Sequence, residues 1–152
     1  MKEEIDFLWT LAWDDLTIFG SAIFSLFLIV LFSTLGFIDF SIKLLMSFIL
    51  AYLVTILIRS FYFKERPKKQ EFSNYIEKID ASSFPSMHSI RGSIYTTLFF
   101  LNFNNTYLIS LFFILMIIIS FSRYINKKHH LSDILAGLLI GMLIGFFSNF
   151  LI

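Results

Sequence analysis

Residues 16–35 form a run of twenty residues without a charged side chain. A run of about 20 apolar residues is the length that a helix needs to cross the hydrocarbon core of a bilayer. Four further apolar stretches follow at 41–63, 85–101, 107–121 and 131–152. Only 15% of the chain is charged and 57% is hydrophobic, whereas soluble domains are about one quarter charged. We therefore expect an all-α, polytopic membrane bundle of five transmembrane helices, forming one domain over residues 1–152.

Residues 1–15 have a different pattern from these five stretches. Acidic residues are mixed there with apolar ones, and the apolar positions recur at three- and four-residue spacing. Two of the apolar residues are Trp9 and Trp13. Tryptophan favours the membrane interface, and the spacing is that of an amphipathic helix. The segment is predicted to be an interfacial helix.

The charges also restrict the partners of the chain. A formal net charge of +1 gives no basic surface for nucleic acid, and the lack of cysteine excludes thiol catalysis. Eleven of the twelve Lys and Arg residues fall on one side of the five-span topology, with Lys43 on the other. The positive-inside rule would make that side cytoplasmic. We expect a multi-pass protein of the cell membrane.

The first polar cluster is a pair of arginines. Arg59 interrupts an apolar run, and an arginine at membrane depth costs about 2.5–3.5 kcal/mol on insertion scales, which marks it as a functional candidate. Arg66 would lie two turns further along the same face if the helix continues. Guanidinium groups bind phosphate oxygens in a bidentate fashion. The alternative is that Arg59 reaches the interface and Arg66 is an ordinary loop cation.

The second cluster begins the span at 85–101 with the sequence PSMH, followed one turn later by Arg91. A helix N-terminus presents unpaired N–H groups that attract an anion. Ser86 adds a hydroxyl, and His88 adds a group that exchanges protons near neutral pH. The alternative is a capped helix with a histidine at the interface.

The third cluster consists of Ser122 and Arg123, then His129 and Asp133. The four-residue step from His129 to Asp133 puts imidazole and carboxylate on one helical face, and a carboxylate can orient a histidine as nucleophile or base. The alternative is a solvated structural pair. His130 lies about 100° around the helix and is the weaker candidate.

All three clusters fall on the same side of the predicted topology. Two histidines and an aspartate could bind zinc, but three arginines nearby would repel the cation. The combination predicts an anion site without a metal.

These residues resemble the motifs of the type 2 phosphatidic acid phosphatase (PAP2) superfamily, which also includes the vanadium haloperoxidases. The family motifs are a lysine, six residues and Arg-Pro; Pro-Ser-Gly-His; and Ser-Arg, five residues, His, three residues and Asp. The chain has RSFYFKERP at 59–67, PSMH at 85–88 and SRYINKKHHLSD at 122–133. A haloperoxidase is not expected, because such enzymes are typically soluble.

The resemblance implies a role for each matching residue. His129 would attack phosphorus and form a phosphohistidine, with Asp133 holding its ring, and His88 would act as general acid and then as base. Three arginines, a hydroxyl and backbone amides would hold the phosphoryl oxygens: Arg59, Arg66, Arg123, Ser86 and the backbone near Met87. The resemblance implies that a phosphatase of this kind needs no cofactor or metal.

Three features depart from the family pattern. Arg59 replaces the family lysine, and Met87 replaces a glycine, which would be strained if that position needs a positive φ. Membrane members usually have six spans, so the first is missing here or reduced to the segment 1–15.

The function expected from this resemblance is a metal-independent lipid phosphatase acting on a lipid phosphomonoester or a polyprenyl diphosphate. Two alternatives stay open: a lipid phosphotransferase that uses the same site, and a non-catalytic membrane protein that binds an anionic lipid. Gly137, Gly141 and Gly145 form a smooth stripe on the last span, which predicts close helix packing, within the chain by preference or between chains in a homo-oligomer.

Overall fold

The computed structural model describes residue 13 and residues 15–152, and the elements in this part of the chain are all helical. They are η1 (Thr17–Gly20), α2 (Ala22–Thr34), α3 (Ile38–Phe61), α4 (Tyr75–Ala81), α5 (Met87–Asn102), α6 (Thr106–Ile125) and α7 (Leu131–Leu151). The predicted all-α class is confirmed. The predicted interfacial helix at 1–15 falls almost entirely outside the described residues.

Three of the described helices, α3, α6 and α7, are long and apolar enough to cross a membrane. The chain is therefore an integral membrane protein. The other two predicted spans are shorter as helices, with 16 residues in α5 and 13 in α2. At a rise of about 1.5 Å per residue, neither reaches the full thickness of a hydrocarbon core of about 30 Å.

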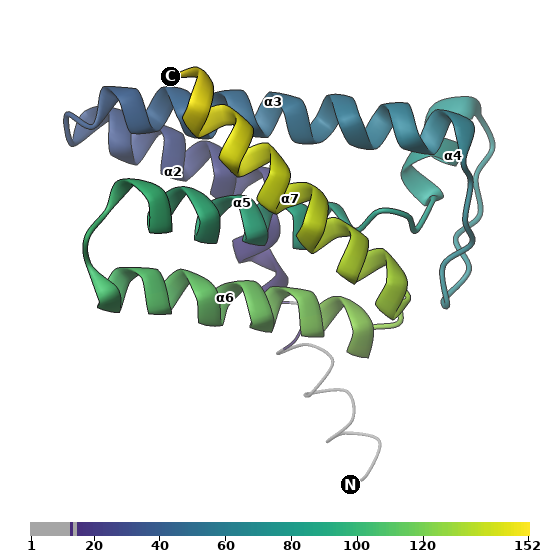
Figure 1. Cartoon of the computed structure of the whole chain (residues 1–152). Coiled ribbons are helices and arrows are strands. Elements are labelled where there is room, and N and C mark those ends of the chain that lie inside the picture. The colour runs from purple at the N-terminus through teal and green to yellow at the C-terminus, as the bar shows by residue number, and fades with distance from the viewer. Residues whose placement is uncertain (1–12, 14) are drawn as a thin grey trace, which may run out of the picture.

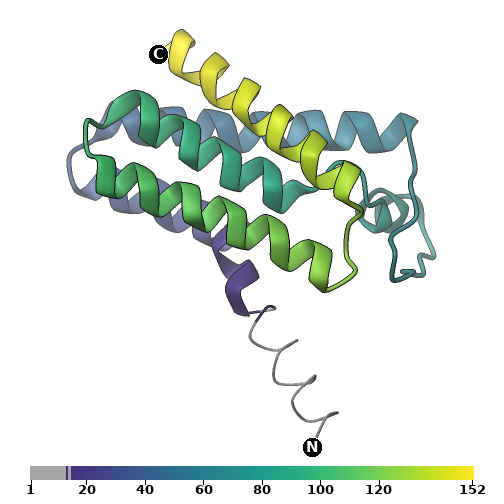
Figure 2. The ribbon, with the colours of Figure 1, turned by 60° about the horizontal axis from the view of Figure 1, so that its bottom comes forward.

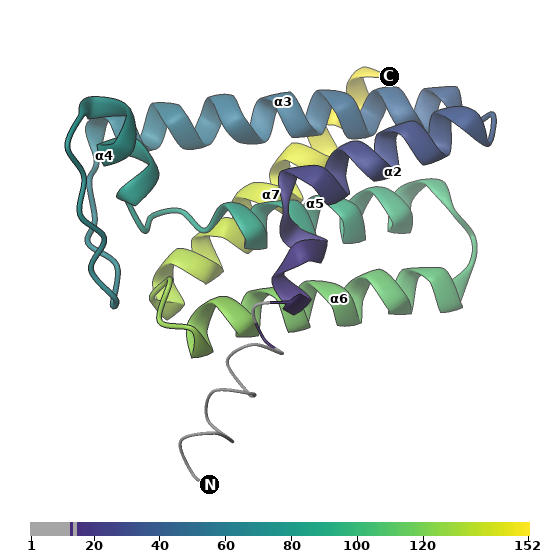
Figure 3. The same ribbon diagram turned by 180° about the vertical axis from the view of Figure 1, so that it is seen from behind.

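The prediction of one continuous helix over 16–35 is wrong. The helix is interrupted at Ser21, whose backbone is extended (φ −78°, ψ 165°) and whose hydroxyl accepts a hydrogen bond from the Phe24 N–H at 3.1 Å. Ser21 is thus the N-cap of α2. The preceding turn, η1, leaves the axis of α2 and runs toward α6 (Figure 3). A run without charges predicts burial in lipid but not the continuity of a helix.

Helix α5 is the centre of the bundle. It contacts α3, α6 and α7, and α7 crosses it diagonally (Figures 1 and 2). Its buried apolar residues include Ile90, Ile94, Leu98 and Phe99. Phe99 stacks on Phe112 of α6 with ring centroids 3.8 Å apart.

The glycine stripe of α7 faces α5. A Cβ at Gly137 would lie 2.7 Å from the Ser86 carbonyl oxygen, and one at Gly145 would lie 2.9 Å from Thr97 Cβ. At Gly141 a Cβ would overlap the carbonyl oxygen of Ile90. The predicted close packing within the chain is confirmed, and this stripe is occupied by α5.

The polar segments gather at the two ends of the bundle. The long connection 62–86 and the turn 126–130 meet at one end, on the right in Figure 1. At the opposite end, Lys43 Nζ donates to Asn102 Oδ1 (2.8 Å) and Asn149 Oδ1 (3.0 Å) and ties α3 to the last turns of α5 and α7. All three predicted motif clusters lie at the first of these ends.

Replacing Gly141 with alanine tests the packing of α7 on α5. Because the new methyl group would meet backbone atoms of Ile90, we expect the free energy of unfolding to fall by about 1–3 kcal/mol. Thermal unfolding in detergent measures the change. Leu143→Ala is the control, since Leu143 lies in the same helix but its side chain is 58% exposed. A Gly141→Ala variant as stable as the wild type would contradict the packing argument.

Candidate active site

A cavity of about 490 Å³ opens at the end of the bundle where the motif clusters meet. Its walls come from α3, α4, α5, the C-terminal end of α6, the start of α2, the loop after α3 and the turn before α7. Two histidines and four arginines line it: His88, His129, Arg59, Arg66, Arg91 and Arg123. Asp80 is the only carboxylate among the described lining residues. This set of donors suits an anion.

Arg59 and Arg66 reach the cavity by different routes. Helix α3 ends at Phe61 and the backbone of Tyr62 is extended, so the condition under which Arg66 would share a helical face with Arg59 is not met. Arg66 instead lies in the loop that follows α3, and its side chain donates to the Asp80 carbonyl at 2.7 Å. Arg59 is 8% exposed and donates to the carbonyls of Asp80 (3.3 Å) and Pro85 (3.0 Å). Backbone carbonyl oxygens orient both side chains but, being uncharged, do not neutralise the two positive charges.

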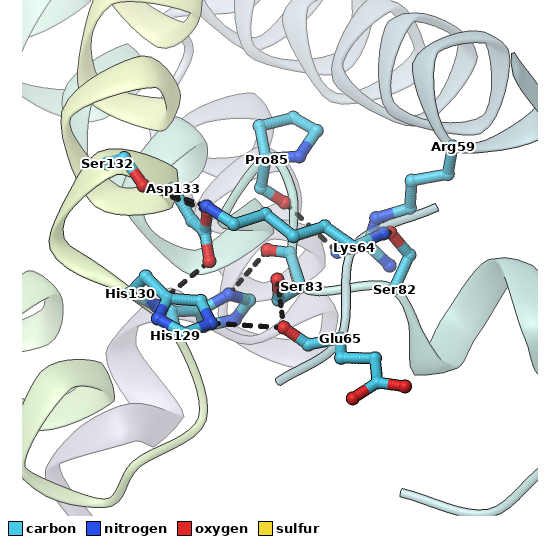
Figure 4. A network of polar contacts seen from close by, with 10 residues as sticks. All are labelled: Arg59, Lys64, Glu65, Ser82, Ser83, Pro85, His129, His130, Ser132 and Asp133. Atoms are coloured by element: carbon cyan, nitrogen blue, oxygen red, sulfur yellow. Dashed lines mark hydrogen bonds and ion pairs between the residues drawn. The ribbon is translucent and has the colours of Figure 1, made fainter. Parts of the chain in front are cut away.

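His129 is held by the main chain. Its Nδ1 lies 2.6 Å from the carbonyl oxygen of Ser83, and the residue is 2% exposed (Figure 4). Because a carbonyl oxygen only accepts hydrogen bonds, Nδ1 carries the proton and Nε2 keeps its lone pair. His129 also lines the cavity, so its side chain can contact a ligand there.

Asp133 differs from the expected geometry, in which it would hold the ring of His129. Its carboxylate is fully buried, and Oδ1 lies 2.5 Å from Lys64 Nζ while Oδ2 accepts the His130 N–H at 2.9 Å. Asp133 therefore fixes the turn that carries His129, with no contact to the ring among the described hydrogen bonds. The ring contact belongs to Ser83.

Lys64 is a site residue that the sequence did not reveal. Its Nζ contacts Asp133 and Ser132 Oγ (2.8 Å), and its carbonyl accepts the Ser83 N–H at 2.8 Å. The side chain thus holds the turn that carries His129, and the main chain holds the residue that orients the His129 ring. In the sequence Lys64 is one of five basic residues between 64 and 83, and nothing in the motif spacing singles it out.

The PSMH segment forms the start of α5. Met87 is the first residue of the helix, and among the described non-glycine residues only Lys127 has a positive φ. The expected strain at Met87 is therefore absent, and its Sδ accepts a hydrogen bond from Thr55 Oγ1 at 3.4 Å. Ser86 is fully buried and caps the helix, with Ser89 Oγ 3.1 Å from its hydroxyl. Unlike Met87 and His88, Ser86 is not among the residues that line the cavity.

The turn η1 covers His88. A Cβ at Gly20 would lie 2.9 Å from His88 Cδ2 and 2.8 Å from Ile119 Cγ2, so only a glycine fits this approach without movement. Gly20 also accepts a hydrogen bond from Arg91 Nη1 at 2.9 Å. The break in the first apolar segment is thus what brings η1 over one of the two cavity histidines.

Burial, reinforced by the nearby charges of Arg123 and Arg66, lowers the pKa of His129 to about 3. The imidazole is therefore neutral at physiological pH. A neutral ring with Nδ1–H on Ser83 is the form that can use Nε2 as a nucleophile.

This shift predicts how stability depends on pH. Since the pKa of His129 is about 3 in the folded protein and about 6.5 unfolded, the unfolded state binds more protons between these values. The contribution of the neutral His129 to the free energy of unfolding is therefore fully present above pH 6.5. It decreases on acidification, by at most about 1.4 kcal/mol per pH unit. Unfolding of the phosphate-free protein at pH 7.5 and pH 5 measures it. His129→Gln should lose less stability between the two pH values; an equal loss would contradict the assignment.

The Lys64–Asp133 contact can be tested with a double-mutant cycle. Lys64→Met leaves the buried Asp133 carboxylate without its cation, so we expect a loss of about 1–3 kcal/mol in the free energy of unfolding. Lys64→Met combined with Asp133→Asn should lose less than the sum of the two single variants, because the uncompensated charge is gone. Additive losses in denaturant titrations would show that the two side chains are independent.

Comparisons with known proteins bear on the family and the fold of the chain. The model of the PAP2 superfamily matches residues 40–151. The fold is similar to the crystal structure of Aquifex aeolicus LpxE, with 19% identity, a TM-score of 0.78, and coverage of 93% of this chain and 86% of that one. It is also similar to a transmembrane PAP2 type phosphatidylglycerolphosphate phosphatase from Bacillus subtilis, with 18% identity, a TM-score of 0.78, and coverage of 95% and 76%. No curated protein sequence matches the chain.

Proposed function

The chain belongs to the PAP2 superfamily, and from this premise we propose that it is a metal-independent phosphatase of lipid phosphates. Its substrate is a lipid phosphomonoester or a polyprenyl diphosphate. The observation that carries the proposal is the neutral, oriented His129 in a cavity with four arginines at the end of a membrane bundle. A site that only bound an anion would not need an imidazole nitrogen kept free of protons.

In the first step, His129 Nε2 attacks the phosphorus atom. A P–N bond forms, the bond from phosphorus to the leaving oxygen breaks, and His88 gives its proton to that oxygen. In the second step, water attacks the phosphorus atom of the phosphohistidine and gives a proton to His88, while a P–O bond forms and the P–N bond to His129 breaks. Inorganic phosphate leaves, and both histidines return to their starting states.

Fixed cations stabilise the charge that develops in both steps. Arg59 and Arg66 are held by backbone carbonyls before any ligand arrives, and Arg123 lines the same cavity. Donors that are already oriented need no rearrangement during the reaction, which makes them effective at stabilising a transition state. The N–H groups at the start of α5, near Met87, add the positive end of a helix.

The surroundings of the cavity support a lipid as the substrate. Ile56, Ile76 and Ile79 line it beside the charged residues, and apolar side chains on α3 such as Leu53 and Leu57 are exposed where the bilayer would be. A headgroup in the cavity can therefore remain attached to chains that lie in the membrane.

His129→Ala tests the nucleophile. We expect phosphate release from phosphatidic acid, phosphatidylglycerophosphate or a polyprenyl diphosphate to fall by at least about 10³-fold, with wild-type activity unaffected by EDTA and inhibited by vanadate. His130→Ala is the matched control, because His130 is adjacent but absent from the cavity lining; it should keep most of the activity. Full activity in His129→Ala would rule out the phosphohistidine route.

A further inference from the structure

Arg91 lies in the cavity but is not one of the motif residues. It is 5% exposed, and its Nη1 donates to the Gly20 carbonyl. Its Nε is buried without a hydrogen-bond partner, and no ion pair with a carboxylate is found for it in the described part of the chain. Burying a cation without a counter-charge is costly. The position therefore favours an anion from outside the protein.

The place of Arg91 relative to His88 suggests which anion this is. Arg91 follows His88 by three residues in α5, about 4.5 Å further along the helix axis and on nearly the same face. On the facing wall, Thr55 and Tyr52 precede Arg59 by one and two turns of α3 in the same direction. The cavity thus has a second polar level, deeper in the bundle than the level that holds Arg59 and His88.

Aromatic rings fix the guanidinium at this second level. The Arg91 Cζ lies 5.1 Å from the ring centroid of Tyr52 and 5.8 Å from that of Phe48. These distances are those of cation–π contacts, which limit where the guanidinium can lie. Ser21, Tyr52 and Thr55 also line the cavity.

We infer that Arg91, with Tyr52, forms a second phosphate subsite, and that it directs the enzyme toward lipid diphosphates. This inference rests on the proposed function. There His88 protonates the leaving oxygen, so the leaving group lies on the His88 side of the cavity, next to Arg91. For a diphosphate, His129 forms the P–N bond with the terminal phosphorus and the bridging P–O bond breaks. The departing lipid monophosphate then carries the negative charge that Arg91 stabilises.

The experiment compares two substrates with the same tail, farnesyl diphosphate and farnesyl monophosphate, in detergent micelles. The ratio of their kcat/KM values, diphosphate over monophosphate, should fall about tenfold or more in Arg91→Gln, the scale of losing one charge-stabilising donor, and recover in part in Arg91→Lys. Lys43→Gln makes the same charge change at the far end of the bundle and should leave the ratio unchanged. If Arg91 only anchors η1, both substrates lose equally and the inference is overturned.

A wild-type measurement covers the case in which Arg91→Gln does not fold. Inorganic pyrophosphate should inhibit monophosphate hydrolysis with a Ki about tenfold or more below that of inorganic phosphate; equal Ki values would overturn the inference. Wild-type protein that hydrolyses the monophosphate but not the diphosphate would overturn the second subsite and leave the proposed function intact. Failure with both farnesyl substrates and with phosphatidic acid would instead refute the proposed function.

Discussion

The packing of α7 against α5 through backbone contact is the constraint on which the site depends. Gly141 brings the two helices so close that no side chain fits between them, and Ser93 Oγ donates to the Leu138 carbonyl at 2.7 Å across the same interface. At the cavity end, the Ser86 N–H donates to the Asp133 carbonyl at 3.0 Å. These contacts fix the relative position of the helix that begins at Met87 and the helix that follows His129, so the two histidines meet at one cavity.

The electrostatics of the cavity follow from how its arginines are held. Arg59 and Arg66 use the backbone carbonyls of Asp80 and Pro85 as acceptors, which orient guanidinium groups without cancelling their charge. The buried carboxylate of Asp133, nearby, is paired with Lys64 instead. The cavity therefore keeps an excess of positive charge in a poorly solvated place, where a phosphate group gains more from each cation than it would in water.

The sequence was sufficient to predict that three distant motifs share one site, because helix counting alone placed residues 59–66, 85–88 and 122–133 on the same side of the membrane. It could not predict the parts that depend on tertiary contacts. Lys64 is indistinguishable from its basic neighbours until the loop folds against α7. The acceptor for His129 is a backbone oxygen, which cannot be recognised from the identity of any residue. The break at Ser21 did have a local signal, a serine able to cap a helix, but the unbroken apolar run was the stronger pattern.

The Ser83 carbonyl that accepts the Nδ1 proton of His129 also has a consequence for robustness. A peptide oxygen has no protonation equilibrium in the physiological range, so acidification cannot switch off this orientation as it could with a carboxylate partner. No exchange of the side chain at position 83 deletes the acceptor either. Tautomer control is thus encoded in the path of the main chain through residues 82–86, and the changes that could disturb it are those that displace this turn.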